Sequence, residues 1–275
     1  MTHGTPISIP DRLMALLVSF KLTTAASELA SRLGQAGFND ALPVVLEVFE
    51  QEAHDRLDRR IQRFRNASNL PLGKTFATLE DAHLPRKLLQ TLKDLATGRF
   101  LDEATNVLAF GLPGVGKTHA ACALGHALIE AGHRVLFTPT YQLVQHLLAA
   151  KRDLELPKAL HKLDAFELLI LDDIGYVQQS ADEVEVLFTL MAERYERKSM
   201  LVTSNLVFSQ WDQIFKNPMT TAAAIDRIVH HSVILEFNVP SYRSEAVKKQ
   251  RGAPRANTSP DGKAEKNGKA VKNRR

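Results

Sequence analysis

One segment of the sequence has residue types and spacing that fit phosphate binding. Residues 111–118 read GLPGVGKT and match the pattern G-x-x-x-x-G-K-[ST] in full. Glycines permit positive φ angles and let backbone N–H groups turn inward around phosphate oxygens. In this pattern Lys117 reaches the β- and γ-phosphates of a nucleotide, and Thr118 offers its hydroxyl to Mg²⁺. The predicted loop consists of Gly111, Leu112, Pro113, Gly114, Val115, Gly116, Lys117 and Thr118.

An acidic pair follows an apolar run downstream of this loop. LLILDD, at 168–173, supplies four apolar residues and ends in Asp172 and Asp173. We expect Asp172 to bind the magnesium ion through Thr118 or water, and Asp173 to polarise the attacking water. An acidic pair that only begins a turn is the alternative. The shorter GKT at 73–75 is not predicted to bind phosphate, because Ser68 stands where the pattern requires glycine.

A polar residue also ends the next buried strand pattern, LVTSN at 201–205. Asn205 is thereby positioned to hold the attacking water between the acidic pair and the γ-phosphate. An asparagine that only initiates a turn is the alternative.

The elements that position these residues alternate between strands and helices from about residue 76 to 240. Strand patterns occur at NVLAFG, HRVLFT, FELLILDD, SMLVTSN and SVILEF. Helical patterns lie between them, over THAACALGHALIEAG, 140–151, 155–163 and DEVEVLFTLMAERYERK. Strands separated by helices of this length indicate a mostly parallel sheet with right-handed crossovers. The predicted fold class is therefore α/β, with a parallel central sheet in a three-layer core.

Residues 1–70 are predicted to form a small helical N-terminal domain. Apolar residues from Leu46 to Phe64 recur at steps of three or four, which is one face of a helix. The opposite side of this helix carries Arg56, Arg59, Arg60 and Arg63. These arginines could follow nucleic-acid phosphates without reading bases. A solvated face, partly paired with neighbouring acidic residues, is the equal alternative.

The net charge of +4 belongs to the C-terminal tail. Residues 248–275 carry 10 Lys/Arg and 2 Asp/Glu, which leaves 25 against 29 in residues 1–247. This composition predicts a disordered basic tail.

The single cysteine, Cys122, and the lack of a membrane-spanning apolar window or secretion signal favour a cytoplasmic protein with no membrane partner. His230 and His231 are adjacent rather than at metal-ligand spacing, so no metal site is predicted there.

Longer stretches of the sequence resemble the IstB-like family. They are FGLPGVGKTHAACALGHALIEAGHRVLFT, the run from LLILDD to DQIF at 168–215, AIDRIVHH and SYR. The resemblance covers roughly 10–247, and ERYERKSMLVTSNL is far more discriminating than the phosphate loop alone. Members of this family are AAA+ ATPase helpers encoded beside the transposase in certain bacterial insertion sequences. They are similar to the DnaC-type helicase loaders.

The resemblance implies a P-loop AAA+ ATPase domain at 71–247 that uses ATP and Mg²⁺. It places Arg227, in DRIVHH, where this clade carries an arginine that reaches the nucleotide of the neighbouring subunit. An ion pair of Arg227 with Asp226 or another local acid is the alternative. The implied partners are sequence-nonspecific double-stranded DNA, the transposase encoded beside this chain, and further copies that assemble with ATP and DNA. The implied function is a transposition helper that oligomerises on target DNA and recruits and activates the transposase, with ATP hydrolysis resetting the complex.

Two features depart from the family pattern. The acidic pair is Asp-Asp rather than the Asp-Glu common in ATPase machines, so we expect slow hydrolysis that DNA or a partner stimulates. Little chain separates Phe237 from the basic tail, which leaves no room for a helical lid, and Arg243 is therefore not assigned as a second sensor. The remaining alternatives are a DnaC-type helicase loader, a small-molecule kinase, and a nucleotide-binding scaffold that does not hydrolyse.

Overall fold

The computed structural model describes residues 8–79, 84–176, 180–211 and 218–241, so that Arg243 and the basic tail lie outside it. The strands are β1 (Asn106–Gly111), β2 (Val135–Pro139), β3 (Leu168–Asp172), β4 (Ser199–Ser204) and β5 (Ser232–Phe237). The helices are α1 (Ile9–Ser19), α2 (Thr23–Gln35), α3 (Leu42–Ala67), α4 (Arg86–Leu95), α5 (Arg99–Asp102), α6 (Lys117–Glu130), α7 (Thr140–Arg152), α8 (Leu156–Leu163), α9 (Ala181–Arg194) and α11 (Pro218–Val229). Short 3₁₀ turns are η1 (Asn39–Ala41), η2 (Phe76–Thr78), η4 (Ile174–Tyr176) and η5 (Phe208–Gln210).

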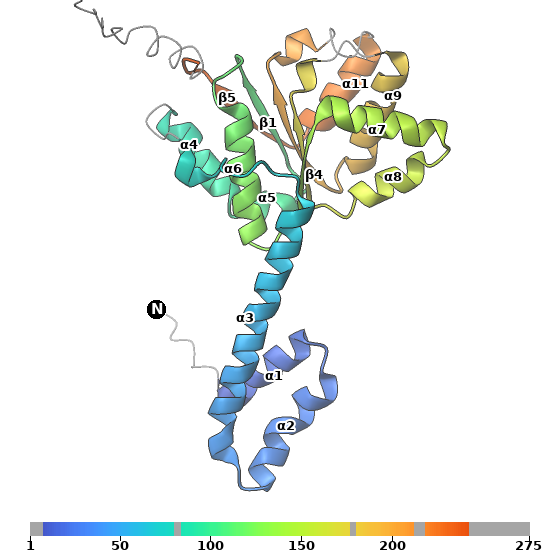
Figure 1. Ribbon diagram of the computed structural model, residues 1–275. Coiled ribbons are helices and arrows are strands. Elements are labelled where there is room, and N and C mark those ends of the chain that lie inside the picture. Colours follow the sequence, from blue (N-terminus) through green and yellow to red (C-terminus); the bar gives the residue numbers. More distant parts are fainter. Residues whose placement is uncertain (1–7, 80–83, 177–179, 212–217, 242–275) are drawn as a thin grey trace, which may run out of the picture.

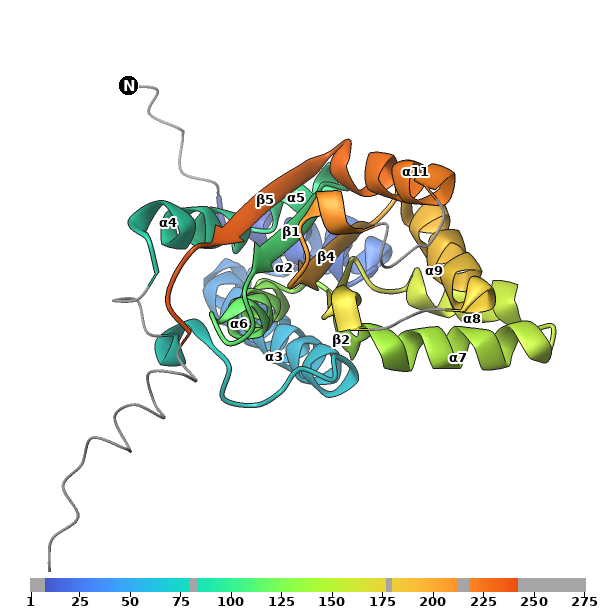
Figure 2. The ribbon, with the colours of Figure 1, turned by 90° about the horizontal axis from the view of Figure 1, so that it is seen from above.

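The five strands form one parallel sheet in the order β2-β3-β4-β1-β5. The strand β4 lies between β3 and β1, although both precede it in the chain. This order brings the carboxyl ends of β1, β3 and β4 side by side, and these are the three strands that end at the predicted site residues. Figure 2 looks down on the sheet and shows helices on both of its sides. The predicted parallel three-layer core is confirmed.

Alternate residues of each strand enter opposite cores, as the pleat of a strand requires. Val107 and Ala109 of β1 pack in the core that contains α4 and α6. Leu108 and Phe110 pack in the other core, with α7, α8, α9 and α11. Because β1 is buried on both faces, it carries the uninterrupted apolar run that its sequence shows. Cys122 lies in the first core, and burial raises the pKa of its thiol to about 12.

Arg194, the last residue of α9, donates hydrogen bonds to backbone carbonyls near the starts of β3 and β4. Its side chain is 1% exposed, and its guanidinium donates to the carbonyls of Leu163, Phe166, Glu167 and Ser199 at 2.9–3.3 Å. Burial lowers the pKa of this guanidinium to about 10, so it stays charged at neutral pH. Leu163 is the last residue of α8 and Ser199 is the first residue of β4. Phe166 and Glu167 lie just before β3, so Arg194 donates to carbonyls of three neighbouring segments.

Replacing Arg194 by methionine is expected to lower the free energy of unfolding by about 3 kcal/mol or more, because several carbonyls lose this donor and a buried carbonyl left without one costs about 1–3 kcal/mol. Arg197→Met is the matched control. Arg197 is more than half exposed and pairs with Asp164 and Glu193, so its loss is expected to cost less than about 1 kcal/mol. Urea unfolding monitored by circular dichroism measures both values. Equal midpoints for the two variants would contradict this account of Arg194.

The N-terminal helices stand away from the sheet on a long helix. Figure 1 shows α3 as a stalk, with α1 packed against its far half and α2 packed against α1. The small core between them consists of Leu13, Leu17, Leu42 and Leu46. At its other end α3 joins the sheet domain: Ile61 is part of the core beneath α6, and Arg65 pairs with Glu130. A single helix therefore belongs to both parts of the molecule.

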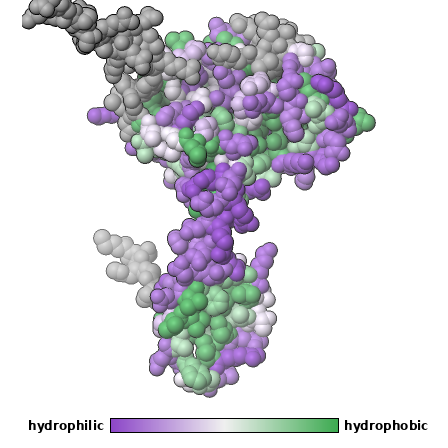
Figure 3. All heavy atoms as spheres, in the orientation of Figure 1, coloured by the Kyte–Doolittle hydropathy of each residue, from purple (hydrophilic) through white to green (hydrophobic). Residues whose placement is uncertain are grey.

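The N-terminal helices expose large apolar side chains. Figure 3 shows an apolar area over these helices and a hydrophilic stretch along the middle of α3. The exposed apolar residues of this region are Ile9, Met14, Val18, Leu22, Phe38, Val44, Val48 and Leu57. Apolar surface on so small a unit is typical of a region that contacts a partner. Within the described ranges, no helix combines the length and apolar character needed to cross a bilayer.

Candidate nucleotide-binding site

The predicted phosphate loop lies between the end of β1 at Gly111 and the start of α6 at Lys117. Gly116 caps the helix with φ 100°, a conformation that residues with a side chain rarely adopt. Gly111 is required for a different reason, because a Cβ atom there would lie 2.8 Å from the carbonyl oxygen of Phe237 on β5. Strand, loop and helix therefore have the arrangement that presents backbone N–H groups and a helix N-terminus to an anion.

Lys117 is 9% exposed and lies against this loop. Its Nζ atom donates to the carbonyl oxygens of Gly111 at 2.6 Å and Leu112 at 3.0 Å. The ammonium group is thereby held among the backbone groups of the loop. It lies where a positive charge can neutralise phosphate oxygens.

Thr118 and Asp172 meet across the start of α6 and the end of β3. The Thr118 hydroxyl lies 2.9 Å from Oδ1 and 3.1 Å from Oδ2 of Asp172. A hydroxyl and a carboxylate at the mouth of a phosphate loop are oxygen ligands of the kind that Mg²⁺ takes. Thr140 also fixes this position, because its hydroxyl donates to the backbone carbonyl of Asp172 at 3.0 Å.

Thr203 is a residue of the site that is not predicted from the sequence. It is 1% exposed on β4, and its hydroxyl donates to Asp172 Oδ1 at 2.7 Å. The same hydroxyl accepts from the backbone N–H of Asp173 at 2.8 Å. One side chain therefore positions both members of the acidic pair. Threonine is common in strands, so the residue type alone carried little signal.

Replacing Thr203 by valine is expected to lower magnesium-dependent nucleotide affinity or turnover about tenfold or more. The variant keeps the shape of the side chain but loses a hydrogen bond to a carboxylate, which is worth about 1.5–3 kcal/mol. Titration of a fluorescent ATP analogue with and without magnesium measures the binding effect. The control is Thr189→Val, which removes a hydroxyl bonded only to the Glu185 carbonyl of its own helix. Identical binding by the two variants would remove Thr203 from the site.

Asp173 follows β3 and has an unusual backbone conformation, and Asn205 follows β4 and has a buried side-chain oxygen without a hydrogen bond to any described residue. Asp173 has φ 64°, in the left-handed region that aspartate tolerates better than most residues. The Oδ1 atom of Asn205 is buried and makes no hydrogen bond to any described residue. This atom lies close to Gly175, where a Cβ atom would collide with it. A buried polar atom without a protein partner is typical of a site that binds a ligand or water.

Arg227 lies on α11, on the side of the sheet that also carries α9. Its Cζ atom lies 4.4 Å from the ring centroid of Phe188, and its Nη1 atom is buried without a hydrogen bond among the described residues. The alternative, an ion pair of Arg227 with Asp226 or another local acid, is not present among the residues that the structure describes. The helix is fixed by buried Asn106, whose Nδ2 donates to the Ile228 carbonyl at 3.1 Å.

The four arginines of α3 are remote from the phosphate loop. Arg56 and Arg59 both pair with Glu52, as the solvated alternative expects. Arg60 donates to the carbonyl of Gly132, just beyond the end of α6 opposite to Lys117. These contacts place the arginine face along the stalk. Arg63 is exposed on the same helix.

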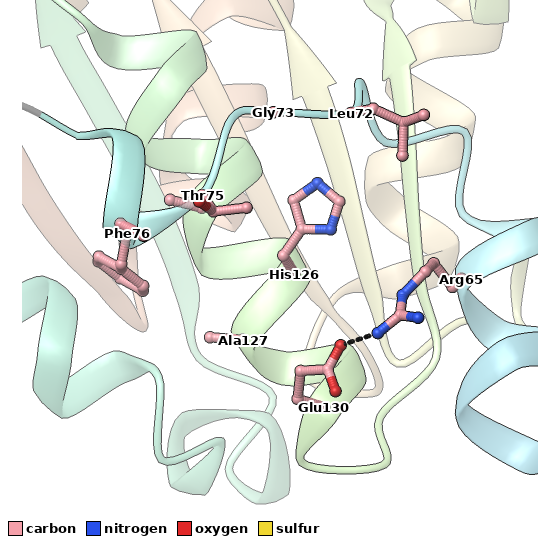
Figure 4. A pocket seen from close by; sticks show the side chains of 10 residues that line it. Arg65, Leu72, Gly73, Thr75, Phe76, His126, Ala127 and Glu130 are labelled. Atoms are coloured by element: carbon pink, nitrogen blue, oxygen red, sulfur yellow. Dashed lines mark hydrogen bonds and ion pairs between the residues drawn. The ribbon is translucent and has the colours of Figure 1, made fainter. Parts of the chain in front are cut away.

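A separate pocket of about 510 Å³ lies on the outer side of α6 (Figure 4). Side chains from three segments line it, including Arg65, Leu72, Thr75, Phe76, His126 and Glu130. Gly73 and Thr75 of the short GKT sequence are at this pocket, and Thr75 caps the turn η2 instead of opening a phosphate loop. None of the residues from 111 to 118 lines the pocket, so it is distinct from the nucleotide site.

A protein family and several known proteins are similar to this chain over most of its length. The model of the family described as IstB-like ATP binding protein matches residues 14–251. A putative insertion sequence ATP-binding protein of Sinorhizobium fredii is 45% identical over 213 residues, which are 76% of this chain and 72% of that protein. The insertion sequence IS21 putative ATP-binding protein of Pseudomonas aeruginosa is 36% identical over 211 residues, 77% of this chain and 79% of that protein.

Solved structures with the same fold include two proteins of low sequence identity. The crystal structure of DnaI matches with a TM-score of 0.51 at 21% identity, over 62% of this chain and 95% of that one. AMPPCP-bound DnaA from Aquifex aeolicus matches with a TM-score of 0.53 at 17% identity, over 69% of this chain and 59% of that one. At these identities the likeness establishes the fold alone, and it confirms the predicted P-loop AAA+ core.

Proposed function

The chain belongs to the family of IstB-like ATP-binding proteins, and from this premise we propose that it is an ATP-dependent helper of transposition. In this proposal, copies of the chain assemble on target DNA with ATP and recruit and activate the transposase encoded beside it. Hydrolysis then resets the complex. The observation that carries the proposal is the contact of Thr118 with Asp172 at the mouth of the phosphate loop. Relatives named as ATP-binding proteins of insertion sequences support the cellular role.

The residues present fit ATP and Mg²⁺. The loop has the glycines and the lysine that a triphosphate requires, and Thr118 and Asp172 supply a hydroxyl and a carboxylate for the metal. Mg²⁺ bound there would neutralise charge on the β- and γ-phosphates. Lys117 and the backbone N–H groups from Gly111 to Thr118 would bind and orient the phosphates. Asp172 and Asp173 at the end of β3 and Asn205 after β4 would then be the side chains nearest to the bound phosphates.

Asp173 and Asn205 are proposed to hold and polarise the attacking water. The Oδ1 atom of Asn205 can accept a hydrogen bond from that water, because no described residue satisfies it. The Asp173 carboxylate is one methylene shorter than a glutamate, so we propose that hydrolysis is slow until DNA or a partner stimulates it. The left-handed backbone at Asp173 favours the shorter side chain, because aspartate adopts this conformation more readily than glutamate.

Arg227 is proposed to complete the nucleotide site of a neighbouring copy. A guanidinium can neutralise charge that develops on the γ-phosphate, and its planar set of donors suits phosphate oxygens. The Nη1 atom of Arg227 supports this role, because a buried donor without a partner among the described residues would gain one if the side chain turned from Phe188 toward a phosphate of the next copy. ATP would then join two copies, since each site depends on an arginine of the next.

We further propose that residues 1–70 contact DNA or a partner and that residues 71–247 form the ATPase domain. The arginine face of α3 supports contact with DNA phosphates, and the exposed apolar side chains of α1 and α3 support contact with protein. Contacts of this ionic kind do not depend on base sequence.

The arginine face is tested by the salt dependence of DNA binding. The double variant Arg59→Ala and Arg63→Ala is expected to lower the slope of log K against log salt by about 2, because each phosphate contact contributes about 0.9. Arg32→Ala is the control, since Arg32 lies exposed on α2 and pairs with Glu28. Fluorescence anisotropy with a labelled duplex measures the slopes. An unchanged slope in the double variant would leave these arginines as a solvated face.

Electron microscopy of the full chain with duplex DNA tests the proposed function. A ring or filament is expected only when both duplex and a non-hydrolysable ATP analogue are present. Assembly on single-stranded DNA in preference to duplex would favour a helicase loader instead. Phosphate release without any added acceptor separates an ATPase from a small-molecule kinase, and its absence with DNA present would indicate a scaffold that does not hydrolyse.

A further inference from the structure

Three potential metal ligands lie together at a place where the sequence suggested none. Glu196 is in the turn after α9, and His230 and His231 are in the connection between α11 and β5. One ligand atom from each residue lies within 4.8 Å of the other two. The Glu196 Oε1 atom is 4.0 Å from His230 Nδ1 and 3.9 Å from His231 Nε2. Adjacent histidines alone lack metal-ligand spacing, and it is the fold that adds the carboxylate.

Several local features direct these side chains toward one point. Glu196 has φ 55°, and this left-handed residue turns the chain sharply between α9 and β4. The two imidazole rings stand edge to face with centroids 4.4 Å apart. His230 Nδ1 also lies 3.2 Å from the hydroxyl of Tyr195, so this nitrogen faces the turn that carries Glu196. A metal ion would replace the tyrosine hydroxyl on that nitrogen.

The donor set and its dimensions fit zinc. Two imidazole nitrogens and one carboxylate oxygen, with an open position for water, are a common set of ligands for Zn²⁺. Ligand bonds of about 2.0–2.2 Å at tetrahedral angles put the ligand atoms about 3.4 Å apart. The separations of 3.9 and 4.0 Å from Glu196, and a histidine–histidine separation of no more than 4.8 Å, therefore need side-chain rotations that bring the three atoms closer together. All three side chains are more than half exposed, which leaves room for such rotations.

We infer that Glu196, His230 and His231 form a binding site for one zinc ion or a similar divalent transition metal ion. The bound ion would fasten the turn after α9 to the end of α11. Arg227 lies one helical turn before His230, so the ion would also fix the part of α11 that carries this arginine. This last consequence rests on the role proposed above for Arg227, whereas metal binding itself does not.

The test is a titration of the full, tag-free chain with Co²⁺, after chelator treatment and with Mg²⁺ in excess. Co²⁺ bound by two histidines and a carboxylate gives visible absorption bands, and Zn²⁺ is expected to displace it at one equivalent. Glu196→Gln and His231→Ala are each expected to weaken metal binding at least about tenfold. His161→Ala is the matched control, because His161 is an exposed histidine on α8 outside the cluster. It is expected to bind like the parent chain.

Other outcomes would overturn the inference. Absence of the visible bands would do so, as would equal binding by the parent chain, Glu196→Gln and His231→Ala. A loss of binding in His161→Ala alone would move the metal to another site. The substituted side chains are exposed, so circular dichroism is expected to show unchanged folds. Neither ATP nor DNA enters the titration, so its outcome is independent of whether ATP-dependent assembly occurs.

Discussion

Replacing Lys117 by alanine is expected to abolish ATP-dependent assembly on DNA. The substitution removes the ammonium that donates to the carbonyls of Gly111 and Leu112 in the phosphate loop. Loss of a buried, hydrogen-bonded charge facing an opposite charge costs about 2–5 kcal/mol, and 3 kcal/mol is more than about a hundredfold in affinity. Binding of a fluorescent ATP analogue measures the first effect. Light scattering with duplex DNA and ATP measures the second, and the transposase assay shows whether strand transfer is still stimulated.

Lys158→Ala is the control for this experiment. Lys158 is a largely exposed residue of α8 that pairs with Glu155, the residue just before that helix, and its loss is expected to leave ATP binding and assembly unchanged. Thermal unfolding of both variants separates a lost ligand contact from a lost fold. If the Lys117 variant remains folded, assembles with ATP on duplex and stimulates strand transfer normally, the proposed mechanism is wrong.

Replacing Arg227 by alanine is expected to leave ATP binding by the single chain nearly intact and to reduce DNA-stimulated hydrolysis about a thousandfold. Arginines that reach the γ-phosphate from a neighbouring subunit contribute about 10³–10⁵ to turnover. Arg227→Lys is expected to recover little, because an ammonium lacks the planar donors of a guanidinium. Steady-state phosphate release with duplex DNA measures all three proteins. Arg197→Ala, in the nearby turn after α9, is the control and is expected to retain turnover.

A mixing experiment distinguishes an arginine that acts on the neighbour from one that acts on its own subunit. Arg227→Ala chains retain the acidic pair, and Asp173→Asn chains retain the arginine. If Arg227 acts on the neighbour, mixtures of the two contain some sites with both groups and regain part of the turnover. Mixtures no more active than either variant alone would place the action of Arg227 within its own subunit.

The strands were predictable because each is a short apolar run bounded by polar or turn residues. β1 and β5 begin and end where NVLAFG and SVILEF do. The pattern over DEVEVLFTLMAERYERK predicts a helix that is too long: α9 ends at Arg194, because Glu196, two residues further on, adopts a left-handed conformation. No helix was predicted over α4, although its buried leucines recur at three- and four-residue steps, and Pro85 precedes it.

The candidate site likewise contains residues that the sequence predicts and residues that it does not. The phosphate loop and the acidic pair are local patterns, so sequence reasoning reaches them. Thr203 becomes part of the site only through the pairing of β3 with β4, in which Leu171 lies beside Val202 and the next residues are Asp172 and Thr203. The contact of Arg60 with Gly132 likewise depends on how α3 meets α6. Contacts of this kind follow from the order of the strands and the packing of the helices.

The continuous helix α3 would act as a lever on any movement of α6. Its 26 residues span about 39 Å at 1.5 Å per residue. Near the sheet, Arg65 pairs with Glu130 in the last turn of α6, and Arg60 donates to the carbonyl of Gly132, two residues beyond that helix. The other end of α6 is the phosphate loop. A reorientation of α6 by about 10° on nucleotide exchange would sweep the tip of α3 through about 7 Å, by the geometry of a rigid rod of that length. Small movements at the γ-phosphate would thus reach the N-terminal helices as a large displacement.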